Sequence, residues 1–419
     1  MKNFYKWFLV AMLSFAFFFH QADRALFGLL TIPIQKELLL TDVQIGWINT
    51  VLSWTMAVMM IVAGFIGDRF SRKWIITISL MFWSLMTICM GWANSFSLFG
   101  IPVGTFAVVM FLRSIATGSG ESFYAPSAYA LIAEYHKESR SVAFSIHQAA
   151  LYIGLMVSGV LVAWCLAYLD SWRNIFFVFG IAGFLLGVFF IFALKNPVGK
   201  ELSAAASKSA VGAGLKAFFA NPSALCASAG FVAIVFVNNA YLFWAPKFAA
   251  QKFLISVGSA GQGVMLYHHL CAFAAILLGG VITDRFTAKY PRFRLGFQII
   301  ALLGGAPMIY LLGAANAWKT FLICSALYGI FRGCFEVNTH ASLFDVIAPQ
   351  YRSTAVGLLN FLGFFVGGFS GVLMGDLAQK FGTRGFEIGF GIMAGFYLAG
   401  ALLMMISFFF TFRKNRVVE

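Results

Sequence analysis

The stretch that decides the fold is Gly-Phe-Ile-Gly-Asp-Arg-Phe-Ser-Arg-Lys at residues 64–73, because a related stretch, Gly-Val-Ile-Thr-Asp-Arg-Phe, stands at residues 280–286. The Asp-Arg pairs of these two copies lie 216 positions apart. A second pair repeats at nearly the same offset, since Ser-Arg-Ser-Val-Ala at 139–143 corresponds to Tyr-Arg-Ser-Thr-Ala at 351–355, 212 positions later. A repeat of this length predicts a chain built from two related halves.

Each copy lies between long apolar stretches. Apolar residues make up 61% of the 419 positions and charged residues 11%, whereas a soluble domain carries roughly 25% charged residues. A helix of about 20 residues crosses the hydrocarbon core of a bilayer. The sequence therefore predicts an all-α membrane protein with twelve transmembrane helices, at residues 6–30, 44–67, 73–93, 102–131, 141–166, 173–194, 222–246, 262–283, 294–315, 319–343, 353–375 and 386–412.

The net charge of +14 follows the predicted topology. With both termini cytoplasmic, 19 of the 29 Lys and Arg residues fall in cytoplasmic segments, seven in outer loops and three within spans. This is the positive-inside distribution of membrane proteins, so the charge indicates a lipid bilayer as partner and argues against nucleic acid. The six cysteines have no Cys-x-x-Cys spacing, and we expect neither a disulfide framework nor a metal site.

A basic segment rich in Ser, Ala and Gly divides the chain. The sequence predicts an N-terminal six-helix bundle at 1–195, a flexible cytoplasmic linker at 196–221 and a C-terminal six-helix bundle at 222–419. Two six-helix halves related by an axis along the membrane normal are typical of secondary transporters that work by alternating access. No nucleophile–base pair, metal cluster or phosphate-binding loop occurs, so we expect a transporter without a cofactor and not an enzyme.

Six ionisable residues fall inside predicted spans, where each charge costs at least about 2.5–3.5 kcal/mol. They are Asp23 and Arg24 in the first span, Arg113 and Glu121 in the fourth, and Arg332 and Glu336 in the tenth. Structural ion pairs are one explanation, although such pairs stabilise a fold poorly compared with apolar packing. We expect instead that the six residues line a cavity.

Each of these groups suggests a role. The guanidinium of Arg24, like that of Arg113, suits an anionic substrate, because it binds a carboxylate through two parallel hydrogen bonds and keeps its charge. Asp23 and Glu121 are candidate proton carriers, since a carboxylate removed from water favours its neutral form. Arg332 and Glu336 lie one helical turn apart and can pair, which leaves a structural, a gating or a proton-coupling role open for Glu336.

The offset between the halves also relates polar residues of different charge. An offset of 215 aligns Glu121 with Glu336, and aligns Asp23-Arg24 with Asn238 and Asn239. The ionisable pair of the first span thus corresponds to two amides in the seventh. We expect Asn238 and Asn239 to contact substrate, and they are also potential ligands if sodium is the coupling ion instead of the proton.

Histidines and aromatic residues supply further candidates for substrate contacts. His147 and Gln148 offer donors and acceptors for a sugar hydroxyl, and Tyr241 and Trp244, close in register on span seven, are candidates for an aromatic wall. The competing interpretation is that these side chains are simply packed in the core. The adjacent histidines at 268–269 point to different helix faces, which argues against a metal site.

The repeated loops predict a gate and not a binding site. We expect the glycines at 64 and 280 to permit close helix approach. We expect each Asp to lie where the following helix begins, where it stabilises the positive helix end, and each Arg to stay at the cytoplasmic face. The predicted gating residues are Gly64, Asp68, Arg69, Arg72, Arg140, Asp284, Arg285 and Arg352.

These motifs resemble the major facilitator superfamily over essentially the whole chain, and more closely its anion:cation symporters. The resemblance is carried by Asp23-Arg24 with Ile-Pro-Ile at 32–34, by Thr-Asp-x-Gln-x-Gly at 41–46, and by Gly-x-Gly-Glu at 118–121 with Pro126. It implies that Arg24 binds the substrate anion and that Asp23 and Glu121 couple transport to protons.

The chain departs from the family pattern at one informative place. The fourth-span Arg usually precedes the Glu by seven residues, but Arg113 precedes Glu121 by eight. Eight residues turn a regular helix by about 800°, which leaves the two side chains about 80° out of line. The spacing therefore predicts that Arg113 and Glu121 do not pair.

The sequence hypothesis is a monomeric, proton-coupled importer of a small organic anion, such as a sugar acid, a uronate or an acidic glycan fragment, in a bacterial inner membrane. The chain also resembles the Spinster-type lysolipid carriers, through its Asp-Arg and Gly-x-Gly-Glu motifs and the segment 345–355. A lysophospholipid carrier and a neutral-sugar transporter are therefore the alternatives, and a sensor that binds without transport is a further one.

Overall fold

The computed structural model describes all residues except 1, 68–69, 137–138, 196–207, 288 and 418–419. The chain forms two compact units. Unit 1 comprises residues 1–205, 242–250 and 255–266, and unit 2 comprises residues 206–241, 251–254 and 267–419. Two long helices, α10 (Pro222–Phe253) and α11 (Val257–Thr287), contribute residues to both units.

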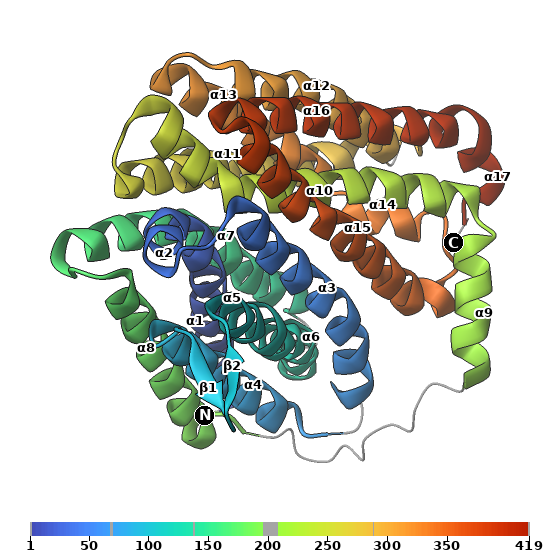
Figure 1. Ribbon diagram of the computed structural model, residues 1–419. Helices are drawn as coiled ribbons and strands as arrows, with labels where there is room; N and C mark the ends of the chain where they lie inside the picture. Colours follow the sequence, from blue (N-terminus) through green and yellow to red (C-terminus); the bar gives the residue numbers. More distant parts are fainter. Residues whose placement is uncertain (1, 68–69, 137–138, 196–207, 288, 418–419) are drawn as a thin grey trace. The chain divides into compact units, whose positions relative to one another are not determined.

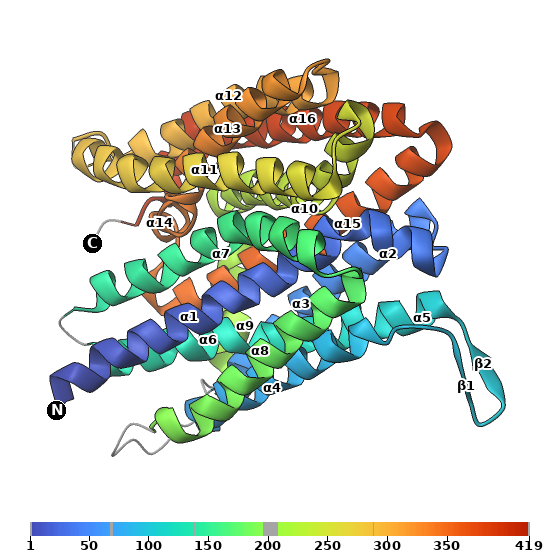
Figure 2. The same cartoon turned by 90° about the vertical axis from the view of Figure 1, so that its left-hand side faces the viewer.

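Unit 1 is a helical bundle with one small hairpin (Figure 1). Its elements are α1 (Lys2–Leu29), α2 (Thr31–Leu38), α3 (Asp42–Gly67), α4 (Arg72–Gly91), β1 (Phe96–Leu98), β2 (Ile101–Val103), α5 (Thr105–Val109), the π-helix η1 (Met110–Ala116), α6 (Thr117–Tyr135), α7 (Arg140–Tyr168) and α8 (Trp172–Ala193). The hairpin projects beyond α5 (Figure 2) and pairs Phe96 with Val103. It replaces the start of the predicted span at 102–131, which begins as helix only at Thr105.

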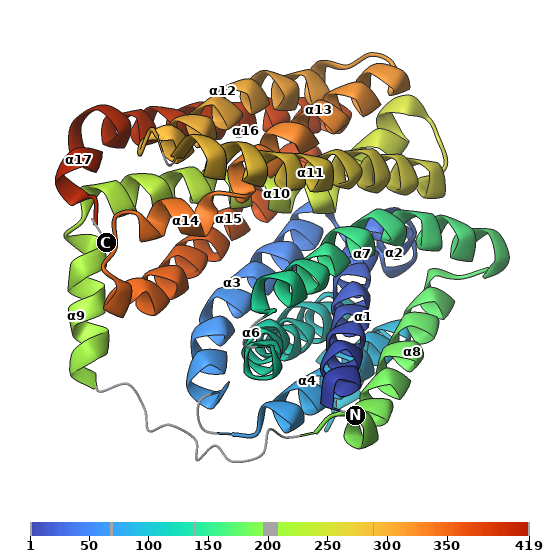
Figure 3. The same cartoon turned by 180° about the vertical axis from the view of Figure 1, so that it is seen from behind.

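Unit 2 is helical throughout its described residues. Apart from its shares of α10 and α11, its elements are α9 (Lys208–Phe219), α12 (Phe293–Ala314), α13 (Trp318–Glu336), α14 (Thr339–Phe344), the 3-10 helix η2 (Pro349–Tyr351), α15 (Arg352–Phe381), α16 (Thr383–Ile406), the π-helix η3 (Ser407–Thr411) and α17 (Phe412–Asn415). The helices α12, α13 and α16 lie side by side (Figure 3).

The structure confirms an all-helical membrane fold. Within the described residues, ten helices are long and apolar enough to cross a membrane. The predicted first and fourth spans correspond to α1 and to the stack of α5, η1 and α6, which are not among these ten. The first carries Asp23 and Arg24 and the fourth carries Arg113 and Glu121, and charged residues lower the hydropathy of a segment.

Glycines let the helices of unit 1 approach closely. A Cβ on Gly154 of α7 would lie 2.6 Å from the carbonyl oxygen of Phe18 in α1, and a Cβ on Gly180 of α8 would lie 2.6 Å from the side chain of Ile88 in α4. Small residues at such contacts are the usual means of packing helices in a membrane, because lipid offers no hydrophobic driving force for helix association. The resulting pairs α1–α7 and α4–α8 frame the buried residues of unit 1.

Part of the predicted flexible linker is helical. Residues 208–219 form α9, which packs on α15, while residues 196–207 lie outside the described residues. Gly214 and Phe218 are buried and stand one turn apart, so they form an inward face toward α15. The prediction of a linker rich in small residues missed this face because only one large apolar side chain marks it.

The structure adds local detail to the repeat. Leu39 and Leu254, which are 215 positions apart, both adopt the left-handed conformation, with φ of 53° and 54°. The next helix in each case starts with a hydroxyl cap, in which Thr41 accepts from the amide of Gln44 and Ser256 accepts from the amide of Ser259. The two caps are also 215 positions apart, so the same turn geometry recurs in the two parts of the sequence.

Candidate functional site

A cluster of buried polar side chains lies between α1, α4 and α6 in unit 1. Helix α1 supplies His20, Gln21 and Asp23, all of which are less than 10% exposed. The hydroxyl of Thr87 in α4 donates to a carboxylate oxygen of Asp23 at 3.0 Å. The side-chain amide of Gln21 lies 2.9 Å from Nδ1 of His20. Asp23 is thus held by a neutral donor, a contact that the sequence pattern did not reveal.

Arg113 and Glu121 pair, so the sequence prediction for them is wrong. Nη1 of Arg113 lies 3.5 Å from Oε1 of Glu121. The reason is the π-helix at Met110–Ala116, which begins just before Arg113 and ends before Glu121. A π-helix closes each turn with one more residue than an α-helix, so it absorbs the extra residue and returns both side chains to one face. Such π-helical turns are frequent at functional sites.

Glu121 is the centre of this cluster. It is 1% exposed, and its second carboxylate oxygen lies 3.9 Å from Nε2 of His20. Neither oxygen has a hydrogen-bond partner among the described residues. Arg113 uses another nitrogen to donate to the backbone oxygen of Arg24 at 2.7 Å. Because buried carboxylates are normally hydrogen-bonded, the cluster has unused acceptor capacity.

The other predicted contacts in unit 1 are arranged differently. Arg24 is half-buried and adjoins the cluster through its backbone. His147 is fully buried and stacks on Phe17 with ring centroids 4.5 Å apart, and its ring nitrogens have no hydrogen-bond partner among the described residues. Gln148 is exposed and accepts from the hydroxyl of Tyr129. His147 and Gln148 therefore do not act as one polar pair.

Unit 2 has its own buried cluster on α11 and α13. Nε of Arg332 donates to Glu336 at 2.8 Å, and Nη1 of Arg332 lies 3.0 Å from Nε2 of His268. The same Nη1 lies 3.5 Å from Nε2 of His269. Adjacent positions on a helix predict different faces for the two histidines, yet both rings reach one guanidinium.

Tyr241 and Trp244 both lie in α10, and both side chains are fully buried. The hydroxyl of Tyr241 contacts that of Ser325. An aromatic wall made by the two rings stays a prediction. Asn239 is buried and Asn238 is half-buried, with Oδ1 of Asn238 lacking a hydrogen-bond partner within the described part of the chain.

The gate loops are described only in part. Asp68 and Arg69 lie outside the described residues, as does the side chain of Arg140. Arg72 begins α4 and pairs with Glu134 near the end of α6. A Cβ on Gly64 would meet no atom within 4 Å in the described part of the chain, so the expected close helix approach is not found there.

In unit 2 the predicted helix-start position of Asp284 is wrong. Asp284 and Arg285 lie in the last turns of α11, and the next helix begins at Phe293. The carboxylate of Asp284 lies 3.3 Å from Arg294 in the first turn of α12, and Arg294 also lies 3.2 Å from Asp345. Asp284 therefore reaches α12 through an arginine side chain and not as a helix cap.

The remaining gating candidates sit near this bridge. Arg352 donates to the backbone oxygen of Phe344 at 3.2 Å and lies over its ring. Burial raises the pKa of the Asp345 carboxyl, while Arg294 and Arg416 oppose the rise. A Cβ on Gly280 would make only an ordinary contact with Val337, at 3.5 Å.

Sequence reasoning also missed a buried lysine. Lys247 was counted as an outer-loop residue, but it lies inside α10 and is 4% exposed. Its ammonium group contacts Asp42 and donates to Gln35 at 2.6 Å, and all three residues belong to unit 1. The apolar stretch continues after Lys247 as Phe248-Ala-Ala, and this continuation was the available signal.

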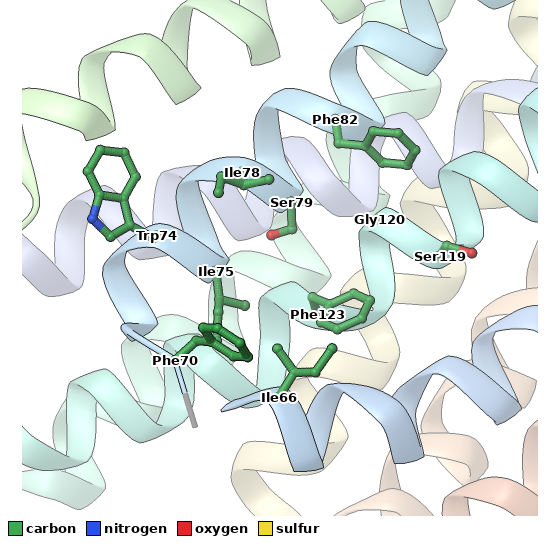
Figure 4. A pocket seen from close by; sticks show the side chains of 10 residues that line it. All are labelled: Ile66, Phe70, Trp74, Ile75, Ile78, Ser79, Phe82, Ser119, Gly120 and Phe123. Atoms are coloured by element: carbon green, nitrogen blue, oxygen red, sulfur yellow. The ribbon is translucent and has the colours of Figure 1, made fainter. Parts of the chain in front are cut away.

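An apolar groove opens between α3 and α4 over α6. It has a volume of about 390 Å³, and its lining includes Ile66, Phe70, Ile78, Phe82 and Phe123 (Figure 4). The two hydroxyls in the lining donate to backbone oxygens: that of Ser79 to Ile76 in α4, and that of Ser119 to Ile115 in η1. The groove includes Gly120, the residue before Glu121, but none of the ionisable residues of the cluster lines it.

The chain belongs to the Major Facilitator Superfamily, whose family model matches residues 13–309 and 250–418. This family consists of transporters, so the prediction that the chain is not an enzyme is confirmed. Within the described residues, no three His, Cys, Asp or Glu side chains are grouped so as to hold a metal ion.

Individual relatives support the two resemblances made from the sequence. The chain is 24% identical to the probable galactarate/D-glucarate transporter of Bacillus subtilis, over 91% of this chain and 88% of that protein. It is 29% identical to the probable galactarate/D-glucarate transporter GarP of Escherichia coli, over 63% of each chain. It is 25% identical to the protein spinster of Drosophila melanogaster, over 84% of this chain and 58% of that protein.

Solved structures confirm the fold. The crystal structure of a bacterial homologue of the human lysosomal transporter Spinster, inward-facing and unoccupied, matches with a TM-score of 0.81 at 18% identity and covers 99% of both chains. A D-xylose–proton symporter matches with a TM-score of 0.75 at 16% identity and covers 100% of both chains. At these identities the matches establish the fold alone.

Proposed function

We propose that the chain is a proton-coupled uptake carrier for a small organic anion of the sugar-acid class, in a bacterial inner membrane with both termini cytoplasmic. The observation that carries the proposal is the environment of Glu121, which is buried beside Arg113 and His20 without a hydrogen bond to either oxygen among the described residues. A buried carboxylate without a hydrogen bond has acceptor positions open to a proton donor or to a bound substrate.

Two further features support an anionic substrate. Arg113 lies in the cluster and Arg24 adjoins it through its backbone oxygen, and arginine is the side chain best suited to a carboxylate. The relatives from Bacillus subtilis and Escherichia coli are described as probable galactarate/D-glucarate transporters. In the proposed cycle, Arg24 binds a substrate carboxylate, and Asp23 and Glu121 carry the protons.

The test is uptake of radiolabelled galactarate and D-glucarate into proteoliposomes with and without an inward proton gradient. We expect accumulation only with the gradient. Glu121→Gln should abolish accumulation while retaining counterflow, which needs binding and conformational exchange but no net driving force. Asp376→Asn is the matched control. Asp376 is an acid at an exposed site, and it pairs with Lys380 one helical turn later. Accumulation driven equally well by sodium alone would overturn the proton coupling.

A lysophospholipid carrier is the second candidate, and the apolar groove of about 390 Å³ favours it. An amphipathic substrate needs an apolar surface for its acyl chain, and sugar acids do not. The same proteoliposomes should therefore be tested for competition by lysophosphatidylglycerol. Transport of this lipid, with none of galactarate or glucarate, would replace the sugar-acid proposal.

A further inference from the structure

The hairpin of β1 and β2 in unit 1 has an apolar face. Its register pairs Phe96 with Val103 and Ser97 with Pro102. Side chains of paired residues share a face of the sheet, and every second residue of a strand returns to that face. Phe96, Val103 and Ile101 therefore lie on one face, while Ser97 and Pro102 lie on the other.

The apolar face of the hairpin is open. Phe96 is 50% exposed and Ile101 is 68% exposed. A two-stranded hairpin is only marginally stable by itself in water, so an open apolar face gains stability from a cover. None of the residues 92–104 is charged, whereas turns that face water are usually polar. The segment is therefore suited to an apolar partner.

The turn at the tip of the hairpin presents a further apolar ring. Phe99 and Gly100 form the two-residue loop between the paired residues Leu98 and Ile101, with φ of 50° and 82°. Such a turn favours Asn-Gly or Asp-Gly, because a bulky side chain is strained at positive φ. Phe99 nevertheless occupies the strained position and is 95% exposed. A strained position that holds an open aromatic ring indicates a contact outside the chain.

The hairpin lies at the level where α4 leaves the membrane. Trp74 stands in the first turn of α4 and Trp92 follows its last residue, and both are exposed, as are Ile78 and Phe82 between them. The rise of a helix places the two tryptophans about 27 Å apart, close to the thickness of the hydrocarbon core. Tryptophan at both ends of a span is typical of the two membrane interfaces.

The direction of the hairpin also fits the membrane surface. The first strand, β1, begins four residues after Trp92. In Figure 2 the two strands run across the direction of α4 and do not continue onward from its end. The hairpin thus turns sideways at the level of the interface.

We propose that this hairpin is an interfacial anchor, which lays its apolar face and Phe99 in the adjacent lipid leaflet. The bilayer is the partner because the hairpin continues the exposed apolar side of α4 at the depth of Trp92. The third span ends at the surface opposite the start of α1, so the leaflet is the outer one under the topology proposed above. The anchor is a contact separate from substrate binding and proton coupling.

The first experiment maps the lipid contacts of the full chain in phosphatidylcholine nanodiscs that hold one copy, so that a second copy cannot supply the contact. A phosphatidylcholine with a diazirine near the glycerol end of one acyl chain is photoactivated, and peptide mass spectrometry locates the adducts. Trp74 is the internal reference, because it is exposed at the other end of α4. We expect adducts within residues 96–101 as well as at Trp74. Adducts at Trp74 with none in 96–101 would overturn the proposal.

The variant Phe99→Asn separates a lipid contact from a purely structural role. Asparagine accepts positive φ, so without a lipid contact the substitution relieves strain and slows amide hydrogen exchange in residues 96–103. With the contact, the variant loses the anchoring ring, and we expect exchange in nanodiscs to become about tenfold faster. Unchanged or slower exchange would overturn the proposal.

Ser97→Asn is the matched control for this variant. It introduces the same residue on the other face of the hairpin and removes no apolar side chain. Ser97 and Phe99 are both exposed, so neither variant removes a core contact. Exchange in Ser97→Asn should stay within about twofold of the wild type. A rise equal to that of Phe99→Asn would show that the apolar ring is not the cause, and would overturn the anchor.

Discussion

The two buried clusters of this chain differ in how completely their hydrogen bonds are made. In unit 1, Glu121 lies 3.5 Å from Arg113 and 3.9 Å from His20, and neither carboxylate oxygen has a hydrogen-bond partner in the described chain. In unit 2, the charged groups of α13 bond directly, with 2.8 Å between Arg332 and Glu336. Leaving a buried acceptor without a hydrogen bond costs about 1–3 kcal/mol, so the unit 1 cluster carries a cost that the unit 2 pair avoids.

The same two units use opposite charges for an equivalent contact. In unit 1, Arg173 donates to Glu37 at 2.8 Å and to the backbone oxygen of Gly91 at 3.0 Å. In unit 2, Lys252 donates to Glu387 at 2.7 Å and to the backbone oxygen of Gly313 at 2.6 Å. Lys252 is 215 positions after Glu37, so the cation occupies the position of the acid. The repeat has preserved the ion pair while exchanging its charges.

The largest expected effect comes from removing the cation of the unit 1 cluster. Arg113→Met should lower the free energy of unfolding by about 3–5 kcal/mol, because it leaves Glu121 buried at 1% exposure without its cation. Arg332→Met should cost less, since the Glu336 side chain is 22% exposed and water can replace the lost partner. Thermal unfolding of the purified variants measures both.

The double variant Arg113→Met with Glu121→Gln tests the reason for that cost. It should recover most of the lost stability, because no unpaired charge then remains buried. Equal losses for Arg113→Met and Arg332→Met would contradict the contrast drawn between the two clusters.

An intermediate effect is expected from deleting one residue of the π-helix. Ile115 is 43% exposed, and its deletion reduces the spacing from Arg113 to Glu121 to seven, which a regular helix tolerates. We expect a folded protein that retains the pair. Ile330 is 39% exposed and lies 215 positions later in α13, so its deletion is the matched control. That deletion rotates Gly329 away from Arg332 by about 100° and should abolish the folded state.

Folding of both deletion variants is measured by their yield and by their elution volume in size-exclusion chromatography. The uptake assay then measures their activity. Loss of folding in the Ile115 deletion would show that the π-helix does more than absorb one residue.

The smallest effects concern two acids outside the spans. The hydrogen bond from Arg173 lowers the pKa of Glu37 below its ordinary value of 4.5, against a smaller opposing effect of burial. The stabilising contribution of ionised Glu37 is therefore present above pH 4.5, and it is lost as pH falls through the lowered pKa. Burial raises the pKa of Asp345 above 3.8. The stabilising contribution of its neutral carboxyl is therefore present below pH 3.8, and it is lost as pH rises through the raised pKa.

Glu37→Gln and Asp345→Asn should therefore show opposite pH trends in thermal unfolding. The destabilisation by Glu37→Gln should shrink in acid, and Asp345→Asn should gain relative stability as pH rises. Each change should be about 1 kcal/mol or less, because Glu37 is an exposed partner. Parallel trends for the two variants would contradict the assigned causes of the two pKa shifts.

The sequence by itself determined the membrane class, the two-part repeat and the positions of the intramembrane charges. These depend on composition, on the length of apolar stretches and on local motifs, which are visible along one dimension. The fold class, the family and the exclusion of an enzyme are accordingly confirmed, while the roles of Asp23, Arg24 and Glu121 remain proposals.

Only the tertiary structure decided which of these residues meet. The pairing of Arg113 with Glu121 depends on a π-helix that helical periodicity does not anticipate. The convergence of His268 and His269 on Arg332 depends on the close approach of two helix backbones at Gly329 and Gly333. Such contacts are set by packing between segments far apart in sequence, and a side chain's face on its own helix does not determine its partner on another.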